Sequence, residues 1–331
     1  MKEQIKTILE DAGRVVVLQA DNPDADSLGA ALALEAILEE QGKHVALYCA
    51  VDIPNYLQYL SGWDRVINDL PKQFDASIIV DASTQTLFQK TIDNGEFQWL
   101  STKPCIVLDH HAETTNDIGF ASVVINEPQA SSTCELIYTV FNELYGAVPT
   151  DAFNPIMTGI LGDTQGMTNP MAGAETYRVM SELVRAGADR PALEELRRAS
   201  SKMQESIYRY KGELIARTEL DATGRIATVV IPQDEIHEYS PLYNPGPLIQ
   251  GDMLQIENVL VGIVFKVYDD GKITAMIRCN PGAEVANKLA VKFGGGGHGF
   301  AAGFKYTNGA PFAEIKKAAL EYTTALLDTI V

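Results

Sequence analysis

The sequence predicts an α/β protein in which a doubly wound, mainly parallel sheet is followed by a smaller α/β domain. In the first part of the chain, apolar β-branched runs alternate with segments of helical period, which is typical of a parallel sheet. These runs cover 15–18, 44–49, 76–80 and 104–108. The 331 residues suffice for two domains of ordinary size, which we predict over 1–198 and 218–331 with a helical linker over 199–217.

The helices of the first domain are predicted from apolar periodicity and from residues that start or stop helices. They cover 1–12, 27–41, 132–145, 151–161, 174–186 and 191–199. Gly42 ends the second of these, and Ser132 with Glu135 predicts a capping box at the start of the third. In the second domain, strands are predicted over 226–231, 259–267 and 273–279, and helices over 284–293 and 311–330.

The composition is that of a globular protein with a substantial core and a strongly acidic surface. Hydrophobic residues make up 46% of the chain, charged residues 21%, and the formal net charge is −18. Because duplex nucleic acid requires clustered Lys and Arg, the charge argues against duplex DNA as a partner. Small anions can still bind where metal ions or a local basic patch reverse the negative electrostatic potential.

The four cysteines are scattered and form no CxxC pair: Cys49, Cys105, Cys134 and Cys279. Buried free thiols in a reducing compartment explain this pattern better than a disulfide framework. The polar N-terminus lacks the pattern of a signal peptide, and no apolar run is long enough to span a membrane. We therefore expect a cytoplasmic protein with no membrane partner.

The loop after the first strand holds two closely spaced carboxylates. Asp24 and Asp26 follow Pro23 in a short turn, and Ser27 opens an Ala- and Leu-rich helix. Two carboxylates this close repel each other unless a proton or a cation lies between them. The alternative is an Asp-rich turn with Ser27 or Asp26 as the helix N-cap, which is the commoner role of such a turn.

Two further strands end in residues able to bind metals. The strand over 76–80 is followed by Asp81, and the strand over 104–108 by Asp109, His110 and His111. The helix over 151–161 stops at a glycine followed by Asp163. Because the carboxyl ends of parallel strands share one edge of a sheet, we expect these side chains to converge with Asp24 and Asp26.

Several carboxylates with one ligating imidazole indicate a pair of divalent ions, and we predict Mn²⁺. Such a site lowers the pKa of a bridging water and holds a phosphoryl group during displacement. Taken singly, an Asp after a strand is usually a cap, and a His is usually satisfied or exposed. The metal hypothesis gains weight because the simpler explanation would have to hold at four places at once.

The motifs resemble those of the DHH phosphoesterases in order and spacing. They are PDAD at 23–26, VDAS at 80–83, LDHH at 108–111 and GILGDT at 159–164. The second domain resembles the DHH-associated domain through IRC at 277–279 and GGGGHGFAAG at 294–303. The chain looks most like the branch of nano-RNases and 3',5'-bisphosphate nucleotide (pAp) phosphatases, and the resemblance covers nearly its whole length.

The resemblance implies a role for each matching residue. Asp24 would bind the first metal ion, Asp26 the second, and Asp81 both. His110 and Asp163 would complete the second site, His111 would contact the phosphate, and Asp109 would orient an imidazole. In the second domain, the resemblance implies substrate binding by Arg278, Gly295, Gly296, Gly297 and His298.

One position departs from the family pattern. The family usually has a histidine three residues before the proline of the first motif, where this chain has Ala20. Asn22 is a substitute ligand whose amide oxygen binds more weakly than a carboxylate, and Gln19 and Asp21 are nearby candidates. The resemblance therefore predicts a weakened first metal site.

The favoured hypothesis is a metal-dependent phosphoesterase that hydrolyses short oligonucleotides or pAp. One alternative is a phosphodiesterase for cyclic di-AMP or linear dinucleotides. Another is a nucleotide-binding pseudoenzyme, for which Ala20 is the only argument. The resemblance also leaves open a homodimer.

Overall fold

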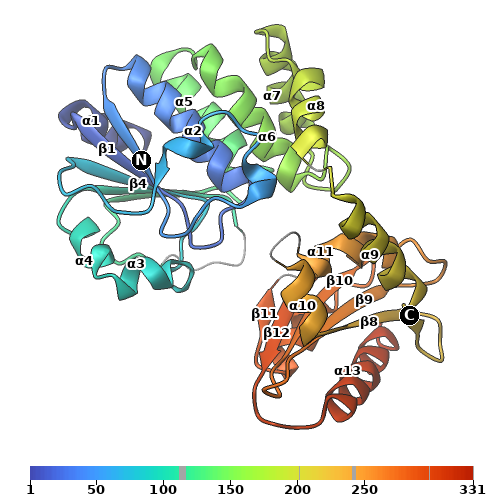
Figure 1. The fold of residues 1–331 in the computed structure, drawn as a ribbon. Coiled ribbons are helices and arrows are strands. Elements are labelled where there is room, and N and C mark those ends of the chain that lie inside the picture. The colour runs from blue at the N-terminus through green and yellow to red at the C-terminus, as the bar shows by residue number, and fades with distance from the viewer. Residues whose placement is uncertain (112–116, 201, 241–243, 298, 331) are drawn as a thin grey trace. The chain divides into compact units, whose positions relative to one another are not determined.

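The computed structural model describes all residues except 112–116, 201, 241–243, 298 and 331. His298, predicted to bind substrate, therefore lies outside the described residues. The chain divides into two compact units, Met1–Lys202 and Met203–Val331, which are described separately. Each unit contains one six-stranded sheet (Figure 1).

The sheet of the first unit is parallel throughout, in the order β3-β2-β1-β4-β5-β6. Its strands are β1 (Arg14–Leu18), β2 (His44–Tyr48), β3 (Val66–Ile67), β4 (Ala76–Val80), β5 (Cys105–Asp109) and β6 (Val123–Asn126). The order reverses at β1, where β2 and β4 flank the first strand. In such a sheet, ligands bind at the carboxyl ends of the strands that flank the reversal.

Helices cover both faces of this sheet, which confirms the doubly wound prediction (Figure 1). One face packs against α1 (Lys2–Asp11), α2 (Ala25–Glu40), α5 (Thr133–Tyr145) and α6 (Phe153–Asp163). The other packs against α3 (Gln89–Asp93), α4 (Glu96–Leu100) and the 3-10 turn η3 (Gln85–Phe88). Alternate strand residues serve the two cores: Val15 and Val17 face α2, whereas Val16 and Leu18 face the opposite side.

The remaining helices of the first unit are α7 (Ala174–Arg185) and α8 (Arg190–Ser200), with 3-10 turns η1 (Asn55–Leu57), η2 (Trp63–Arg65) and η4 (Thr150–Ala152). Helix α6 packs very closely against α2 and α5. At Gly159, an added Cβ would collide with Cys134 and with the carboxyl of Asp26. The glycine therefore lets α6 approach the acidic loop.

The second unit has a mixed sheet in the order β11-β12-β10-β9-β8-β7. Its strands are β7 (Glu219–Leu220), β8 (Ile226–Pro232), β9 (Val261–Val267), β10 (Ile273–Cys279), β11 (Gly296–Gly297) and β12 (Ala301–Tyr306). Among the described strands of this second sheet, only β8 and β9 pair in parallel. One face packs against α12 (Ala286–Lys292) and α13 (Phe312–Leu327), and the other against α9 (Glu205–Ala216), α10 (Gln233–Tyr239) and α11 (Pro245–Met253).

Helix α9 falls within the stretch predicted to be a linker. Its residues Ile207, Tyr210 and Leu214 are buried in a core shared with β8 and β9. The strands β6 and β12 and the short helices α3, α4, α10 and α11 had no counterpart in the sequence prediction.

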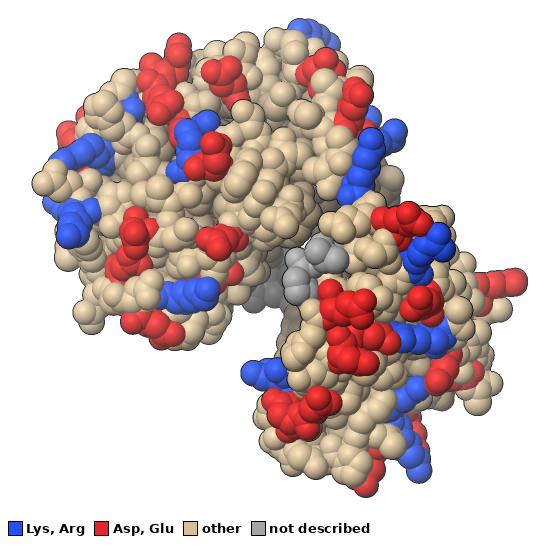
Figure 2. Space-filling model, viewed as in Figure 1, with Lys and Arg blue, Asp and Glu red and all other residues tan. Residues whose placement is uncertain are grey.

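The four cysteines are buried and free, as predicted. Across the described part of the chain, no helix combines the length and the apolar character required to cross a bilayer. The visible face in Figure 2 carries separate basic and acidic clusters instead of one continuous basic stretch.

Candidate metal centre

Metal-binding side chains converge at the carboxyl edge of the first sheet. Two overlapping groups each bring their potential ligand atoms within 4.8 Å of one another. One comprises Asp81, His110 and His111, and the other Asp26, His110 and Asp163. They come from the ends of β4 and β5, the first turn of α2 and the last residue of α6. The structure thus brings together five of the residues singled out in the sequence.

His110 links the two groups. Its Nδ1 lies 3.3 Å from the carbonyl oxygen of Ala130, which leaves Nε2 to face the acidic residues. Nε2 lies 3.0 Å from Oδ2 of Asp163, 3.6 Å from Oδ1 of Asp81 and 3.8 Å from Oδ2 of Asp26. It is buried and makes no hydrogen bond of acceptable geometry. A buried nitrogen facing three carboxylates fits a divalent cation, and its other ring nitrogen is held as it is in metal-ligating histidines.

His111 is held by the last residue of β5. The fully buried Asp109 accepts from His111 Nδ1 at 2.7 Å and from the His110 backbone N–H at 2.9 Å. The hydrogen bond to Asp109 raises the pKa of His111, although burial opposes this shift. Burial would raise the pKa of Asp109, but the pairing with His111 outweighs it and lowers that pKa. Asn126 on β6 donates to the His111 carbonyl at 3.1 Å. Asp109 therefore holds the imidazole of His111 through this hydrogen bond.

The N-terminus of α5 supports Asp26. The backbone N–H groups of Thr133 and Cys134 donate to the two carboxyl oxygens of Asp26 at 2.6 and 3.0 Å. The first N–H groups of a helix have no partner within the helix, so they satisfy an anion well. Ser132 is the N-cap, as predicted, but Glu135 binds Ser131 instead of completing a capping box. The predicted capping box is therefore wrong in its second half, because the Glu135 carboxyl accepts from the Ser131 hydroxyl at 2.5 Å.

Asp81 adopts a strained backbone conformation. Its φ is 59°, a left-handed value that Asp and Asn tolerate better than most residues. Its Oδ1 accepts from the hydroxyl of Thr133 at 3.0 Å. Strain of this kind persists where the surroundings hold the residue in place, and it is common at functional sites. Sequence reasoning missed Thr133, whose only signal was its place directly after a helix N-cap.

The electrostatics of this group favour a bound cation. Burial, followed by the charges of Asp26, Asp24 and Asp163, raises the pKa of Asp81 well above its usual value. Burial and the charge of Asp26 raise the pKa of Asp163 to about 6. Burial opposes protonation of His110, but Asp163 and Asp26 outweigh it and raise the pKa of His110 to about 9. The carboxylates therefore compete for protons, and a divalent ion would relieve the same repulsion.

Asp24 caps α2. Its Oδ1 accepts from the backbone N–H groups of Asp26 and Ser27 at 3.0 and 2.9 Å, and the Ser27 hydroxyl accepts from the Asp24 N–H. The alternative N-caps, Ser27 and Asp26, are therefore wrong, because the helix begins at Ala25. Asp24 is exposed and belongs to neither ligand group.

Ala20 and the three residues considered as substitutes for the missing histidine lie in different environments. Ala20 is buried in the apolar core on the α3–α4 face. Asn22 is exposed, and Asp21 accepts from the Lys90 N–H at 2.7 Å. The Gln19 side chain is fully buried, and neither of its amide heavy atoms has a hydrogen-bond partner. Of the three substitutes for the missing histidine, Gln19 has the least satisfied polar group.

In the second unit, Arg278 projects from β10 and is half-buried. Its guanidinium donates to the carbonyl of Ile277, and it has no carboxylate partner among the described residues. The glycines that follow α12 are partly committed: the Gly295 N–H donates to Ala290, and Gly296 and Gly297 pair with β12. At Gly297, φ is 136° and a Cβ would collide with the Ala301 carbonyl, so the close pairing requires glycine.

Comparison with known proteins identifies the first unit. Residues 14–160 match the family model described as DHH family, N-terminal domain. These residues form a DHH-family domain. The match spans every strand of the first sheet and most of the candidate ligands, and it confirms the resemblance found in the motifs.

Two sequence relatives align along most of the chain. The bifunctional oligoribonuclease and PAP phosphatase NrnA of Thermus thermophilus is 25% identical over 88% of this chain and 83% of its own length. The cyclic-di-AMP phosphodiesterase GdpP of Geobacillus thermodenitrificans is 23% identical over 89% of this chain but only 45% of its own. With the family match, these relatives confirm the prediction of a phosphoesterase-type hydrolase.

A solved structure supports the fold. The exopolyphosphatase-related protein of Bacteroides fragilis superposes with a TM-score of 0.84 at 22% identity, covering 98% of this chain and 97% of that one. At this identity the likeness concerns the fold alone. It confirms the α/β architecture that the sequence predicted.

Proposed function

We propose that this DHH-domain protein is a metal-dependent phosphoesterase that hydrolyses short oligonucleotides and pAp. The observation that carries the proposal is the buried Nε2 of His110, which faces the carboxylates of Asp26, Asp81 and Asp163 without a hydrogen bond. The NrnA relative, named for both activities, supports this choice of substrates.

The donor set fits two divalent ions. Asp26, Asp81, His110 and Asp163 would hold one, and Asp24 and Asp81, with Asn22 or Gln19, the other. Mixed carboxylate and imidazole donors suit Mn²⁺ better than Mg²⁺ or Ca²⁺. When bound, such a pair lowers the pKa of a water between the ions and neutralises charge on the phosphoryl oxygens.

Side chains of the protein would orient the reacting phosphate and hold the metal ligands in place. Asp109 fixes the proton of His111 on Nδ1 and stabilises the imidazolium, so that the ring can donate to a phosphate oxygen. The Thr133 hydroxyl donates to Asp81 Oδ1 and would help hold that carboxyl in place. In the second unit, Arg278, which has no carboxylate partner among the described residues, would bind a phosphate that does not react.

A substrate panel tests the proposal. Protein treated with a chelator and then supplied with Mn²⁺ is assayed on pAp, a linear dinucleotide, a pentanucleotide RNA and cyclic di-AMP. We expect turnover of pAp and of the linear RNAs, lost with the chelator and restored by Mn²⁺. Turnover of cyclic di-AMP alone would favour the activity named in GdpP, and binding without turnover would favour a pseudoenzyme.

A further inference from the structure

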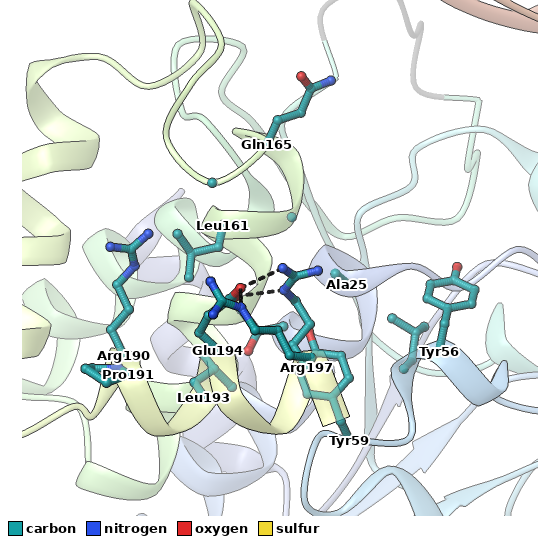
Figure 3. Close-up of a pocket in the computed structure, with 15 residues that line it drawn as sticks. Ala25, Tyr56, Tyr59, Leu161, Gln165, Arg190, Pro191, Leu193, Glu194 and Arg197 are labelled. Carbon is teal, nitrogen blue, oxygen red and sulfur yellow. Dashed lines mark hydrogen bonds and ion pairs between the residues drawn. The ribbon is translucent and has the colours of Figure 1, made fainter. Parts of the chain in front are cut away.

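The first unit contains a pocket of about 670 Å³ that no step of the proposed reaction uses. Its walls come from η1 and the residues after it, the C-terminal half of α6, and α8 (Figure 3). The volume lies in the range of pockets that hold small ligands. All of its lining residues belong to the first unit.

Some residues that line this pocket are sequence neighbours of the candidate metal ligands. Two lining residues, Ala25 and Gly162, directly adjoin Asp24, Asp26 and Asp163 in the sequence. An added Cβ at Gly162 would lie 2.8 Å from the Cβ of Ala25, so the end of α6 packs closely against the start of α2 here. Tyr56, on another wall, donates its hydroxyl to the Pro23 carbonyl at 3.3 Å. An oligonucleotide bound at the metal centre would therefore extend toward residues that line the pocket.

Three arginines of α8 line the pocket against one carboxylate. Glu194 accepts from Arg197 Nε at 2.8 Å and from Arg198 Nε at 2.8 Å, and these bonds lower the pKa of Glu194 to about 2 although burial opposes the shift. Arg190 makes no side-chain hydrogen bond or ion pair with any described residue. The pocket lining thus carries excess positive charge in a chain whose net charge is −18.

Aromatic rings line the same pocket. Tyr56 is 59% exposed, although its hydroxyl is anchored, and Tyr59 lies beside Arg197 in Figure 3. Arg190 and Tyr56 lie toward opposite ends of the pocket in that view. An anchored but exposed ring offers a face on which a nucleobase can stack, and guanidinium groups bind phosphate in a bidentate manner.

A solvated, charged helix face is the simpler explanation, since Arg–Glu pairs three and four residues apart are common on exposed helices. That explanation accounts for Arg197 and Arg198. It does not account for Arg190, which has no acidic partner, or for an exposed tyrosine tied to the acidic loop.

We infer that this pocket, lined by Tyr56, Tyr59, Arg190 and Arg197, binds the part of an oligonucleotide substrate that extends beyond the reacting phosphodiester. Arg190 contacts a backbone phosphate of that extension, and Tyr56 stacks on one of its bases. The inference rests on the proposed function. It predicts that longer linear substrates bind more tightly than pAp, which is too short to occupy both the metal centre and the pocket.

Steady-state kinetics on pAp and on a pentanucleotide RNA with Mn²⁺ test this inference. Arg190→Ala removes the phosphate contact, and Arg185→Ala on α7 is the matched control, because Arg185 is exposed, lies outside the pocket and has no partner among the described residues. We expect Arg190→Ala to raise the ratio of the pentanucleotide KM to the pAp KM by roughly tenfold, as expected for a lost charge-assisted bond. Arg185→Ala should leave the ratio unchanged.

Tyr56 separates stacking from hydrogen bonding. Tyr56→Phe keeps the ring but loses the bond to Pro23, whereas Tyr56→Ala loses both. We expect the KM ratio to rise severalfold in Tyr56→Ala and to stay near the wild-type value in Tyr56→Phe. Similar ratios in the two variants would contradict the stacking role.

The role of Arg190 can also be tested by measuring oligonucleotide binding in the absence of turnover. Anisotropy of a labelled pentanucleotide, titrated in EDTA at several salt concentrations, gives the slope of log affinity against log salt. Loss of one phosphate contact in Arg190→Ala should reduce that slope by about 0.7. An unchanged slope and KM ratio would overturn the inference. So would a change in pAp turnover caused by added AMP that the pentanucleotide cannot displace, because the pocket would then be an effector site.

The two proposals fail in different ways. If the wild-type protein with Mn²⁺ hydrolyses neither pAp nor RNA, the proposed function is wrong. If it hydrolyses both but Arg190→Ala behaves like Arg185→Ala, only the role of the pocket is wrong.

Discussion

His110 Nε2 and Asp163 Oδ2 lie 3.0 Å apart, although they come from the end of β5 and the end of α6. Without a cation, the carboxylates favour protonation here: burial opposes it, but Asp163 and Asp26 raise the pKa of His110 to about 9, while burial and Asp26 raise the pKa of Asp163 to about 6. A bound cation would take both groups as ligands, and ligands bind metal in their deprotonated forms. Metal binding and protonation should therefore oppose each other at this pair.

The stability of the metal-free protein should fall as the pH rises from about 6.5 to 9. His110 has a folded pKa of about 9 and an unfolded pKa near 6.5, so the folded state binds more protons over that range. The stabilisation is complete below pH 6.5, is lost as the pH passes 9, and is on the order of 3 kcal/mol at most. Urea unfolding in EDTA at several pH values measures it.

Asp163→Asn is the matched variant for that measurement. It removes the charge that raises the pKa of His110, so the decline between pH 6.5 and 9 should become shallower. The same slope in both proteins would show that His110 does not hold the extra proton.

Asp81→Asn should abolish turnover while the fold survives. Asn tolerates the left-handed backbone at this position, whereas Ala would add strain, so Asn is the cleaner substitution. We expect the rate with Mn²⁺ to fall by more than about 100-fold, since even partners outside the ligand set are typically worth 10–100-fold. Asp11→Ala, at the exposed end of α1, is the control for surface charge. Wild-type activity in a folded Asp81→Asn protein would refute the two-metal hypothesis.

Thr133→Val should weaken the site without destroying it. The change keeps the buried shape but removes the hydroxyl that donates to Asp81 at 3.0 Å. We expect the Mn²⁺ concentration for half-maximal activity to rise by about tenfold, with a smaller change in the rate at saturating Mn²⁺. Thr139→Val, also on α5, is the control, because its hydroxyl bonds only within the helix. A purely structural role would lower stability and leave the Mn²⁺ requirement unchanged.

Arg278→Ala should mainly raise the KM for nucleotides. A contact to a phosphate that does not react contributes binding in the ground state and the transition state alike. We expect KM for pAp to rise about tenfold, with kcat within about twofold, and little change on a model diester that lacks a second phosphate. Equal losses on both substrates would place Arg278 in a different role.

The convergence of Asp26, Asp81, His110 and Asp163 could be predicted because parallel strands end at one edge and the motifs mark those ends. Thr133 could not, because its role depends on how α5 packs against α2 and β4. Strand β6 was missed because VVIN is only four residues long.

The predictions also failed where tertiary contacts decide a local feature. The capping role of Asp24 competes with the roles of Asp26 and Ser27, and sequence spacing alone does not rank them. The pocket was invisible in the sequence because residues far apart in the chain, such as Tyr56 and Arg197, line it only through long-range packing.

The last prediction concerns the metal site weakened by Ala20. The proposed second site has Asp26, Asp81, His110 and Asp163 as ligands, whereas in the first site Asp24 also caps α2 and Asn22 is exposed. We therefore expect two unequal sites: one filled in the purified protein and one filled only at raised Mn²⁺. A titration that follows bound Mn²⁺ and activity together should show activity rising over the second range, because attack requires both ions.

Three variants identify the ligands of the weaker site. Ala20→His should tighten it by adding an imidazole, and Ala20→Val is the control that adds bulk to the same apolar position without a ligand. Gln19→Leu tests the buried amide that lacks a partner: if Gln19 supplies a ligand, Mn²⁺ should bind the weaker site still less tightly. If Gln19 only fills space, leucine should leave the titration unchanged and raise stability, because an unsatisfied buried amide costs about 1–3 kcal/mol. Two equally tight sites in the wild-type protein would show that the loss of the histidine is fully compensated.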